Sequence, residues 1–171
     1  MVITTALNRM LSVRFNYDRA VYLTQSTDLA LRALMLLGAR DERRPAADLA
    51  GRLHVAPQHM AKIVQRLRGH GFVATSRGRG GGVVLAGGVL DLPVGGIVRA
   101  LEGPGEVVDC EHPPCPLRGG CRLRGALRAA QEAFLASLDG VRLRELVTDP
   151  PEPVLLSLAL AAPGTPPQED S

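Results

Sequence analysis

All three cysteines of the chain lie within twelve residues of one another, in the stretch CEHPPCPLRGGCRLRGAL that begins at residue 110. Four residues separate Cys110 from Cys115, five separate Cys115 from Cys121, and prolines and glycines stand between them. Thiolates donate strongly to iron and other soft metals, and a segment of this composition lets the backbone wrap around a compact centre. The spacing therefore favours a metal site, and an iron–sulfur cluster in particular.

Other interpretations of this stretch stay open. It has no Cys-x-x-Cys pair, which counts against a zinc ribbon, but the three cysteines with His112 could form a Cys3His zinc site. A redox-sensing thiol pair is a third interpretation. A cluster on three cysteines also needs a fourth ligand, and the sequence has no further cysteine. The candidates are Asp109, Glu111 and His112 nearby, and Asp28 if another part of the fold or another subunit delivers it.

A basic segment precedes the cysteines. From Arg43 to Gly80 the chain has eight basic residues and one acid, a net charge of +7, which leaves −4 on the rest of a chain whose total is +3. A concentrated basic block indicates a partner with many negative charges, such as nucleic acid. No stretch reaches about 18 uninterrupted apolar residues and no signal peptide is evident, so we expect a cytoplasmic protein. The sequence shows no nucleophile–base pairing and no phosphate-binding loop, so we do not expect an enzyme.

Helical periodicity predicts a first helix from about Thr24 to Ala39, capped by Thr24. Two short helices follow, the first starting at Pro45, with a tight break between them at residues 54–55. In the second short helix the residues expected to be buried are Met60, Ile63, Val64 and Leu67. Two short strands around a glycine-rich turn at 78–82 come next, and then a short helix capped by Asp91.

These elements describe a winged helix-turn-helix with a two-stranded wing in a mainly α chain. The outer face of the second short helix is polar and cationic, which suits hydrogen bonds to base edges and phosphates. A glycine-lined wing tip lets arginines approach a narrow minor groove, and arginines before the first short helix suit phosphates. The candidate DNA-binding residues are Gln58, His59, Lys62, Gln65 and Arg66 in the helix, Arg77 and Arg79 in the wing, and Arg43 and Arg44 before the first short helix.

A long amphipathic helix follows the cysteines. Leu123, Leu127, Ala130, Phe134 and Leu138 form one apolar face on a helix of about 18 residues, roughly 27 Å long. Such a face at the end of a small domain needs a partner, often the same helix of a second copy, which predicts a homodimer. We therefore expect an extension (1–20), a winged helix-turn-helix domain (21–91), a cluster-binding loop with a dimerisation helix (92–147) and a flexible proline-rich tail (148–171).

Four segments of the chain resemble, in order and spacing, the winged-helix iron–sulfur regulators of the Rrf2 type. They are VYLTQSTDLALRALMLL, HVAPQHMAKIVQRLRGHGFV, RGRGGGVVLA and CRLRGAL, within residues 21–147. The resemblance is strongest to the nitric-oxide-sensing repressors of that family. It implies a homodimer that nitric oxide releases from promoter DNA, a 4Fe–4S cluster on the three cysteines, and Asp28 of the other subunit as the fourth ligand.

One departure from a sister group supports that assignment. The cluster-biogenesis regulators of the same family use a histidine three residues after the last cysteine, where this chain has Arg124, which cannot be a ligand. The alternatives are a regulator of the same family with a 2Fe–2S cluster that reads redox state or iron–sulfur supply, and a zinc-binding protein with no regulatory role.

Overall fold

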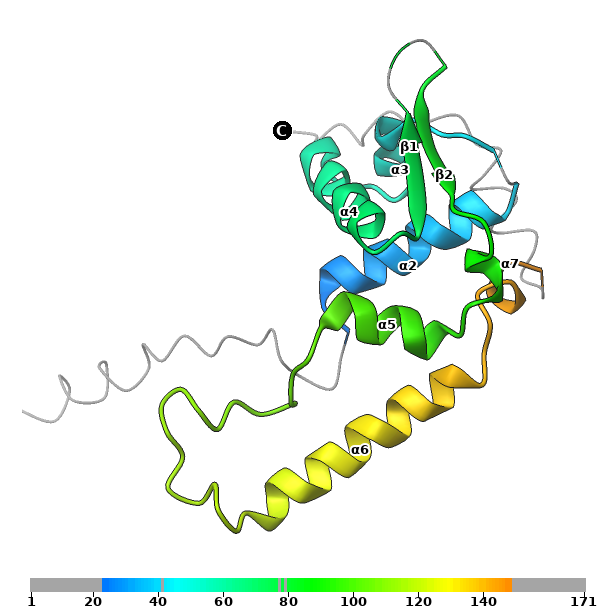
Figure 1. The fold of residues 1–171 in the computed structure, drawn as a ribbon. Coiled ribbons are helices and arrows are strands. Elements are labelled where there is room, and N and C mark those ends of the chain that lie inside the picture. Colours follow the sequence, from blue (N-terminus) through cyan, green and yellow to red (C-terminus); the bar gives the residue numbers. More distant parts are fainter. Residues whose placement is uncertain (1–22, 41, 77, 79, 149–171) are drawn as a thin grey trace, which may run out of the picture.

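The computed structural model describes residues 23–40, 42–76, 78 and 80–148. Its elements in chain order are α2 (Gln25–Gly38), α3 (Ala46–Arg52), α4 (Pro57–Gly69), β1 (Val73–Ser76), β2 (Gly82–Leu85), the 3-10 turn η2 (Val89–Asp91), α5 (Val94–Glu102), α6 (Arg122–Asp139) and α7 (Glu145–Thr148). Figure 1 shows α3, α4 and the strands on one side of α2, α5 on the other, and α6 extending away from them. This confirms a mainly α winged helix-turn-helix. The expected extension (1–20) and all but the first residue of the expected tail (148–171) lie outside the described residues.

Helix α2 forms the centre of the core. Thr24 caps it as expected, because its side-chain oxygen accepts a hydrogen bond from the backbone nitrogen of Thr27 at 3.2 Å. The buried apolar face comprises Leu29, Ala30, Ala33, Leu34, Leu36 and Leu37. Each buried leucine contributes about 1.5–3 kcal/mol relative to an exposed one, so this one helix supplies a large share of the hydrophobic stabilisation.

The helix-turn-helix consists of α3 and α4. His54 takes a positive φ of 52° at the break between them, and the backbone nitrogen of Val55 donates to Ala50 O at 3.0 Å. The predicted apolar stripe of α4 is confirmed, with Met60, Ile63, Val64 and Leu67 all buried. Gly71, with φ 74°, turns the chain from α4 into the wing, a conformation that favours glycine.

The wing is the antiparallel pair β1–β2, which runs in register from Val73↔Leu85 to Ser76↔Gly82. Arg44 adds an isolated bridge to Val83, so the segment before α3 lies along the second wing strand. A Cβ at Gly82 would lie 2.7 Å from Arg44 O, which explains a glycine at this crossing. The wing is therefore fastened to the helix-turn-helix through the backbone.

Helix α5 corrects one expectation. Asp91 does not cap it, since Asp91 ends the turn η2 and the N-cap position is held by Pro93, with no side-chain hydrogen bond. The neighbouring Gly95, unfavourable by helix propensity, lies where α5 meets α6. A Cβ there would be 2.6 Å from Leu135 O and would also meet the Asp139 carboxylate. The glycine permits the close approach of the two helices.

Helix α6 is packed along only part of its length. Near its C-terminal end, Leu135 is buried, and Phe134 and Leu138 pack with it against Val94 and Val98 of α5. Nearer its N-terminus, Leu123 is 65% exposed and Ala130 is also exposed. The predicted apolar face is thus half covered. No helix in the described ranges is long and apolar enough to cross a membrane.

One hydrophobic core spans most of the described chain. It joins residues of α2, α3, α4 and both strands to Ile97 and Leu101 of α5 and to Leu143, which follows α6. Helix α7 returns the chain to this core, where Val147 is buried. Residues on both sides of position 91 share this core.

Candidate metal centre and nucleic-acid interface

The cysteine loop, residues 103–121, runs from the end of α5 to the start of α6, at the end of α6 farthest from the wing (Figure 1). Its first and last cysteines are anchored. The backbone nitrogen of Cys115 donates to Cys110 O at 3.1 Å, which closes a turn. Cys121 is the N-cap of α6, and its Sγ accepts from the backbone nitrogen of Arg124 at 3.4 Å. This contact fixes the Cys121 sulfur at the first turn of α6.

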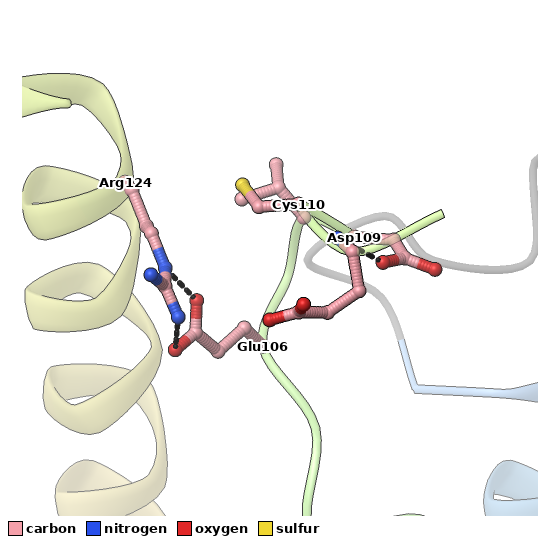
Figure 2. Close-up of a pocket in the computed structure, with 6 residues that line it drawn as sticks. Glu106, Asp109, Cys110 and Arg124 are labelled. Atoms are coloured by element: carbon pink, nitrogen blue, oxygen red, sulfur yellow. Dashed lines mark hydrogen bonds and ion pairs between the residues drawn. The ribbon is translucent and has the colours of Figure 1, made fainter. Parts of the chain in front are cut away.

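The surroundings of the Cys110 thiol shift its pKa. Burial raises the pKa of this thiol, and its neighbour Cys115 and, to a smaller degree, Cys121 raise it further, whereas Arg124 lowers it. Figure 2 shows the Cys110 side chain pointing toward α6, while Asp109 lies on the far side of the loop.

An ion pair joins the start of the cysteine loop to the start of α6. The Arg124 guanidinium donates through Nε and Nη2 to the two oxygens of Glu106, at 2.5 and 2.7 Å (Figure 2). These hydrogen bonds hold the pKa of the Glu106 carboxyl below its ordinary value of 4.5. Arg128 lies 3.9 Å from the same carboxylate, and Gln131 Nε2 donates to Gly105 O at 2.9 Å.

The candidate fourth ligands already have other partners. Asp109 accepts from the backbone nitrogens of Glu111 and His112, at 2.8 and 3.1 Å, and Glu111 pairs with Arg118. Asp28 pairs with Arg32 at 2.9 Å within α2. Among the described residues, no three His, Cys, Asp or Glu side chains are gathered closely enough to hold one metal ion. His112 is the most exposed of the local candidates, and its Nδ1 lies 3.7 Å from Asp109 Oδ2.

This donor set fits a cluster better than a single ion. Zinc–sulfur bonds of about 2.3 Å bring the sulfurs of one zinc ion to within about 3.8 Å of each other. A polynuclear iron–sulfur core separates its ligands more widely, and it takes thiolates for most of its positions. Three free thiols on one loop supply ligands of that type.

The candidate DNA-binding residues differ in their exposure. On α4 the side chains of Gln58, His59, Lys62 and Gln65 are exposed, as expected. Arg66 is half-buried, and its Nη1 donates to Ser26 Oγ at 3.1 Å. The two wing arginines, Arg77 and Arg79, lie outside the described residues.

The two arginines before α3 have different surroundings. Arg43 is exposed and donates to Ser76 Oγ in the wing at 2.5 Å. Arg44 is only 8% exposed and is paired with Asp48 at 3.1 Å and with Glu42 at 3.4 Å. Asp48 also pairs with Arg52 at 2.8 Å. Arg44 thus lies inside an ion-pair network, and Arg43 is the one of the two that a phosphate can reach.

Sequence reasoning missed a set of contacts around the first turn of α2. The backbone nitrogen and the side-chain hydroxyl of Thr24 both donate to Glu102 Oε1, at 2.9 and 3.1 Å. Glu102 is the last residue of α5, directly before the cysteine loop. Two residues after Thr24, Ser26 holds Arg66 of α4. The start of α2 therefore contacts both the last residue of α5 and helix α4.

Comparisons with known proteins agree with this picture. Residues 23–149 match the family model Rrf2, described as an iron-dependent transcriptional regulator. The chain is 52% identical over 140 residues to the HTH-type transcriptional repressor NsrR of Streptomyces coelicolor (strain ATCC BAA-471 / A3(2) / M145), which covers 80% of this chain and 95% of that protein. It is 39% identical over 132 residues to the HTH-type transcriptional regulator NsrR of Geobacillus kaustophilus (strain HTA426), covering 74% and 90%.

Solved structures share the fold at lower identity. Against T. potens IscR the TM-score is 0.60 at 21% identity, covering 75% of this chain and 87% of that one. Against CymR (YrzC), the global cysteine regulator of B. subtilis, it is 0.57 at 22% identity, covering 74% and 96%. These likenesses establish the winged-helix architecture with a long helix after it.

Proposed function

Because the chain belongs to the Rrf2 family of iron-dependent transcriptional regulators, we propose that it is an NsrR-type repressor that senses nitric oxide through a 4Fe–4S cluster. As a transcriptional regulator of this family it binds promoter DNA and is not an enzyme. The observation that best supports sensing is that three free thiols share one loop, anchored at the N-terminus of α6. The cytoplasm, where promoter DNA is found, is the compartment we propose for it.

Cys110, Cys115 and Cys121 would hold the cluster, and Asp28 of a second subunit is the proposed fourth ligand. Within one chain the Asp28–Arg32 pair is exposed, with 43% and 60% of the side chains accessible, so giving it up costs little. A carboxylate is a harder and more exchangeable donor than a thiolate. The cluster position held by Asp28 would therefore be the one at which a small ligand could bind.

A trans ligand requires a homodimer, and the exposed part of α6 supports one. Leu123 is 65% exposed, and exposed alanines (Ala126, Ala130 and Ala133) continue along the helix. Small side chains allow a second helix to approach closely, and an exposed leucine gains from burial. We propose that two copies of α6 cross there, which places two DNA-reading heads on one duplex.

When bound, the cluster supplies iron atoms that react with nitric oxide. The chain's own contacts give the signal a route. Once the cysteines no longer hold the loop, the end of α5 loses a restraint, and Glu102 there holds Thr24 of α2. Ser26 in the same turn holds Arg66 of α4. Movement of this turn would shift the reading helix, and each badly met base pair costs about 1–3 kcal/mol of specific binding.

For DNA itself, we propose that Gln58, Lys62 and Gln65 read base edges and that His59 and Arg43 contact the backbone. Their exposure on α4 and before the wing supports this assignment. The Arg66 guanidinium donates one hydrogen bond to Ser26 and offers its other nitrogens to the DNA groove. Arg77 and Arg79 in the wing keep the role expected for them, which is contact with the minor groove. Arg44 contributes by holding the wing in place through its bridge to Val83.

The test is an anaerobic comparison of three forms of the full chain on DNA. An operator is first selected from random duplexes with the cluster-loaded protein. Native mass spectrometry reports dimer mass and distinguishes a 4Fe–4S cluster from 2Fe–2S or zinc. We expect the loaded form to bind at least tenfold more tightly than the metal-free or nitric-oxide-treated forms. Equal affinity of all three would refute the proposal, and Cys115→Ser provides the matched form that cannot assemble the site.

A further inference from the structure

We infer that Arg124, held by Glu106, is a positioning residue of the cysteine loop, one that keeps the loop's two ends together without metal and sets the charge beside Cys110. The inference rests on the proposed function in one respect, namely that the loop receives a cluster. Arg124 occupies the position at which the sister group of regulators has a histidine ligand. The inference gives Arg124 a role other than metal ligation.

The geometry points to a brace across the loop. Glu106 stands four residues before Cys110, and Arg124 stands three residues after Cys121, so their pair spans the whole cysteine segment. Arg124, Arg128 and Gln131 form a polar seam on one side of α6, at i, i+4 and i+7, and all three face the 105–106 segment. Two parallel N–H···O bonds fix orientation as well as distance, unlike a single contact.

A brace matters because the loop is long and poor in other anchors. Closing a flexible loop of this length carries an entropy cost, which must otherwise be met when the metal binds. Most side chains between residues 111 and 120 are exposed, so packing does little to order them. The seam aligns the segment that leads into Cys110 with the helix that begins after Cys121 before any metal arrives.

The charge of Arg124 is a separate contribution. Its side chain lines the same pocket as Cys110, with Glu106 on the other side of the guanidinium (Figure 2). Three thiolates and a carboxylate give a bound cluster a net negative charge, and the reduction potential of a cluster depends on nearby charge. Arg124 therefore raises that potential, and Glu106 moderates the effect.

Two neutralising variants separate the brace from the charge. Arg124→Gln and Glu106→Gln both break the ion pair, so both should speed amide hydrogen exchange of residues 106–110 in the metal-free protein, by about two- to fivefold. Their effects on the cluster's reduction potential should have opposite signs, lower for Arg124→Gln and higher for Glu106→Gln. Arg124→Lys keeps the positive charge but cannot form the two parallel hydrogen bonds to Glu106. It should restore the reduction potential of the cluster and only part of the protection from amide exchange.

The matched control is Arg122→Gln in the same helical turn, for which no ion pair appears in the described part of the chain. It should leave amide exchange of residues 106–110 at the wild-type rate, with circular dichroism confirming that every variant folds. The inference is overturned if the variants exchange like wild type, or if the potential moves in the same direction in both neutralising variants. If wild-type protein takes up no cluster, the proposed function fails and the charge effect has no cluster to act on, whereas exchange in the metal-free protein still tests the brace. A normal cluster with unchanged variants defeats this inference alone.

Discussion

The Arg66 guanidinium on α4 donates a hydrogen bond to Ser26 Oγ in the first turn of α2, 40 residues earlier in the chain. Arg66, which is expected to contact DNA, therefore also links α4 to α2, the helix that carries Asp28. This hydrogen bond supplements the core packing of Met60, Ile63, Val64 and Leu67, which holds the inner face of α4.

Removing the Ser26 hydroxyl should loosen that tie. Ser26→Ala leaves the α2 backbone in place but deprives Arg66 of its acceptor, a loss of about 1 kcal/mol, so the dissociation constant for specific DNA should rise about fivefold. Fluorescence anisotropy on specific and random duplexes measures this, and the random duplex should show little change. Gln25→Ala, at the exposed adjacent position, is the control. Identical affinities for Ser26→Ala and wild type would show that the contact does not orient α4.

Base reading by α4 gives a second prediction. Gln65 is exposed on the helix, and its amide can pair with an adenine edge, so Gln65→Ala should cost about 1–3 kcal/mol on the selected operator. The loss should be confined to the base pairs that Gln65 reads, and the salt dependence of binding should not change. Arg43→Ala should behave differently, because Arg43 is proposed to contact phosphate, and the slope of log K against log salt should then fall by about one. If Gln65→Ala lowered the affinity equally for all DNA sequences, Gln65 would contact the DNA backbone and not base edges.

The ion-pair network under the wing predicts how stability depends on pH. Burial alone would raise the pKa of Asp48, but hydrogen bonds from Arg52 and Arg44 lower it below its ordinary value of 3.8. The network's stabilisation is therefore complete above about pH 4 and is lost as the pH falls through the lowered pKa. Asp48→Asn should cost about 2 kcal/mol at neutral pH, since it leaves the buried Arg44 short of an anionic partner.

Urea unfolding at a series of pH values checks this point. The difference in the free energy of unfolding between wild type and Asp48→Asn should be largest near neutrality and should vanish at the acid end. A difference that stays constant down to pH 2 would mean that the carboxylate charge is not what stabilises the fold.

The crossing of α5 and α6 predicts opposite results for two adjacent glycines. Gly95→Ala would place a Cβ 2.6 Å from Leu135 O and should cost about 1–3 kcal/mol through overpacking. At Gly96 the added Cβ would meet only Pro93 Cγ, at an ordinary 3.4 Å, so Gly96→Ala should be neutral or stabilising. Thermal unfolding of the two variants measures the contrast, and equal melting temperatures would contradict the close approach at Gly95.

The exposed part of α6 predicts the effect of a charge at the proposed dimer interface. Leu123→Glu, at a side chain that is 65% exposed, should not unfold a single chain but should oppose burial against a second copy. Sedimentation at micromolar concentration should show a shift from dimer to monomer. Ala47→Glu, on the exposed face of α3, is the matched control and should sediment like wild type. If the Leu123→Glu protein remained a dimer, the dimer interface would not include this part of α6.

Local rules predicted much of the fold. The Thr24 cap, the break at His54 and the stripe of Met60, Ile63, Val64 and Leu67 all depend on neighbours in sequence, and the structure confirms them. The cap of α5 was predicted wrongly, because the turn η2 ends at Asp91 and leaves Pro93 as the entry to the helix.

The features that sequence could not supply are long-range. The burial of Arg44, its bridge to Val83 and the Ser26–Arg66 contact depend on which segments meet after folding. The polar seam had a local signal, in Arg124, Arg128 and Gln131 at heptad spacing, but its partner segment could not be read from that spacing. The three thiols were identified by composition alone, whereas their anchoring at the α6 N-cap required coordinates.

The continuous core has a consequence for how such a protein can be re-engineered. Because α5 is built into the same core as the helix-turn-helix, the first residue after it, Gly103, with φ 72°, is where the loop departs from fixed structure. Between Gly103 and the start of α6, Cys110 is the one buried side chain. A different loop could be grafted between these two ends with few changes to the scaffold beneath it.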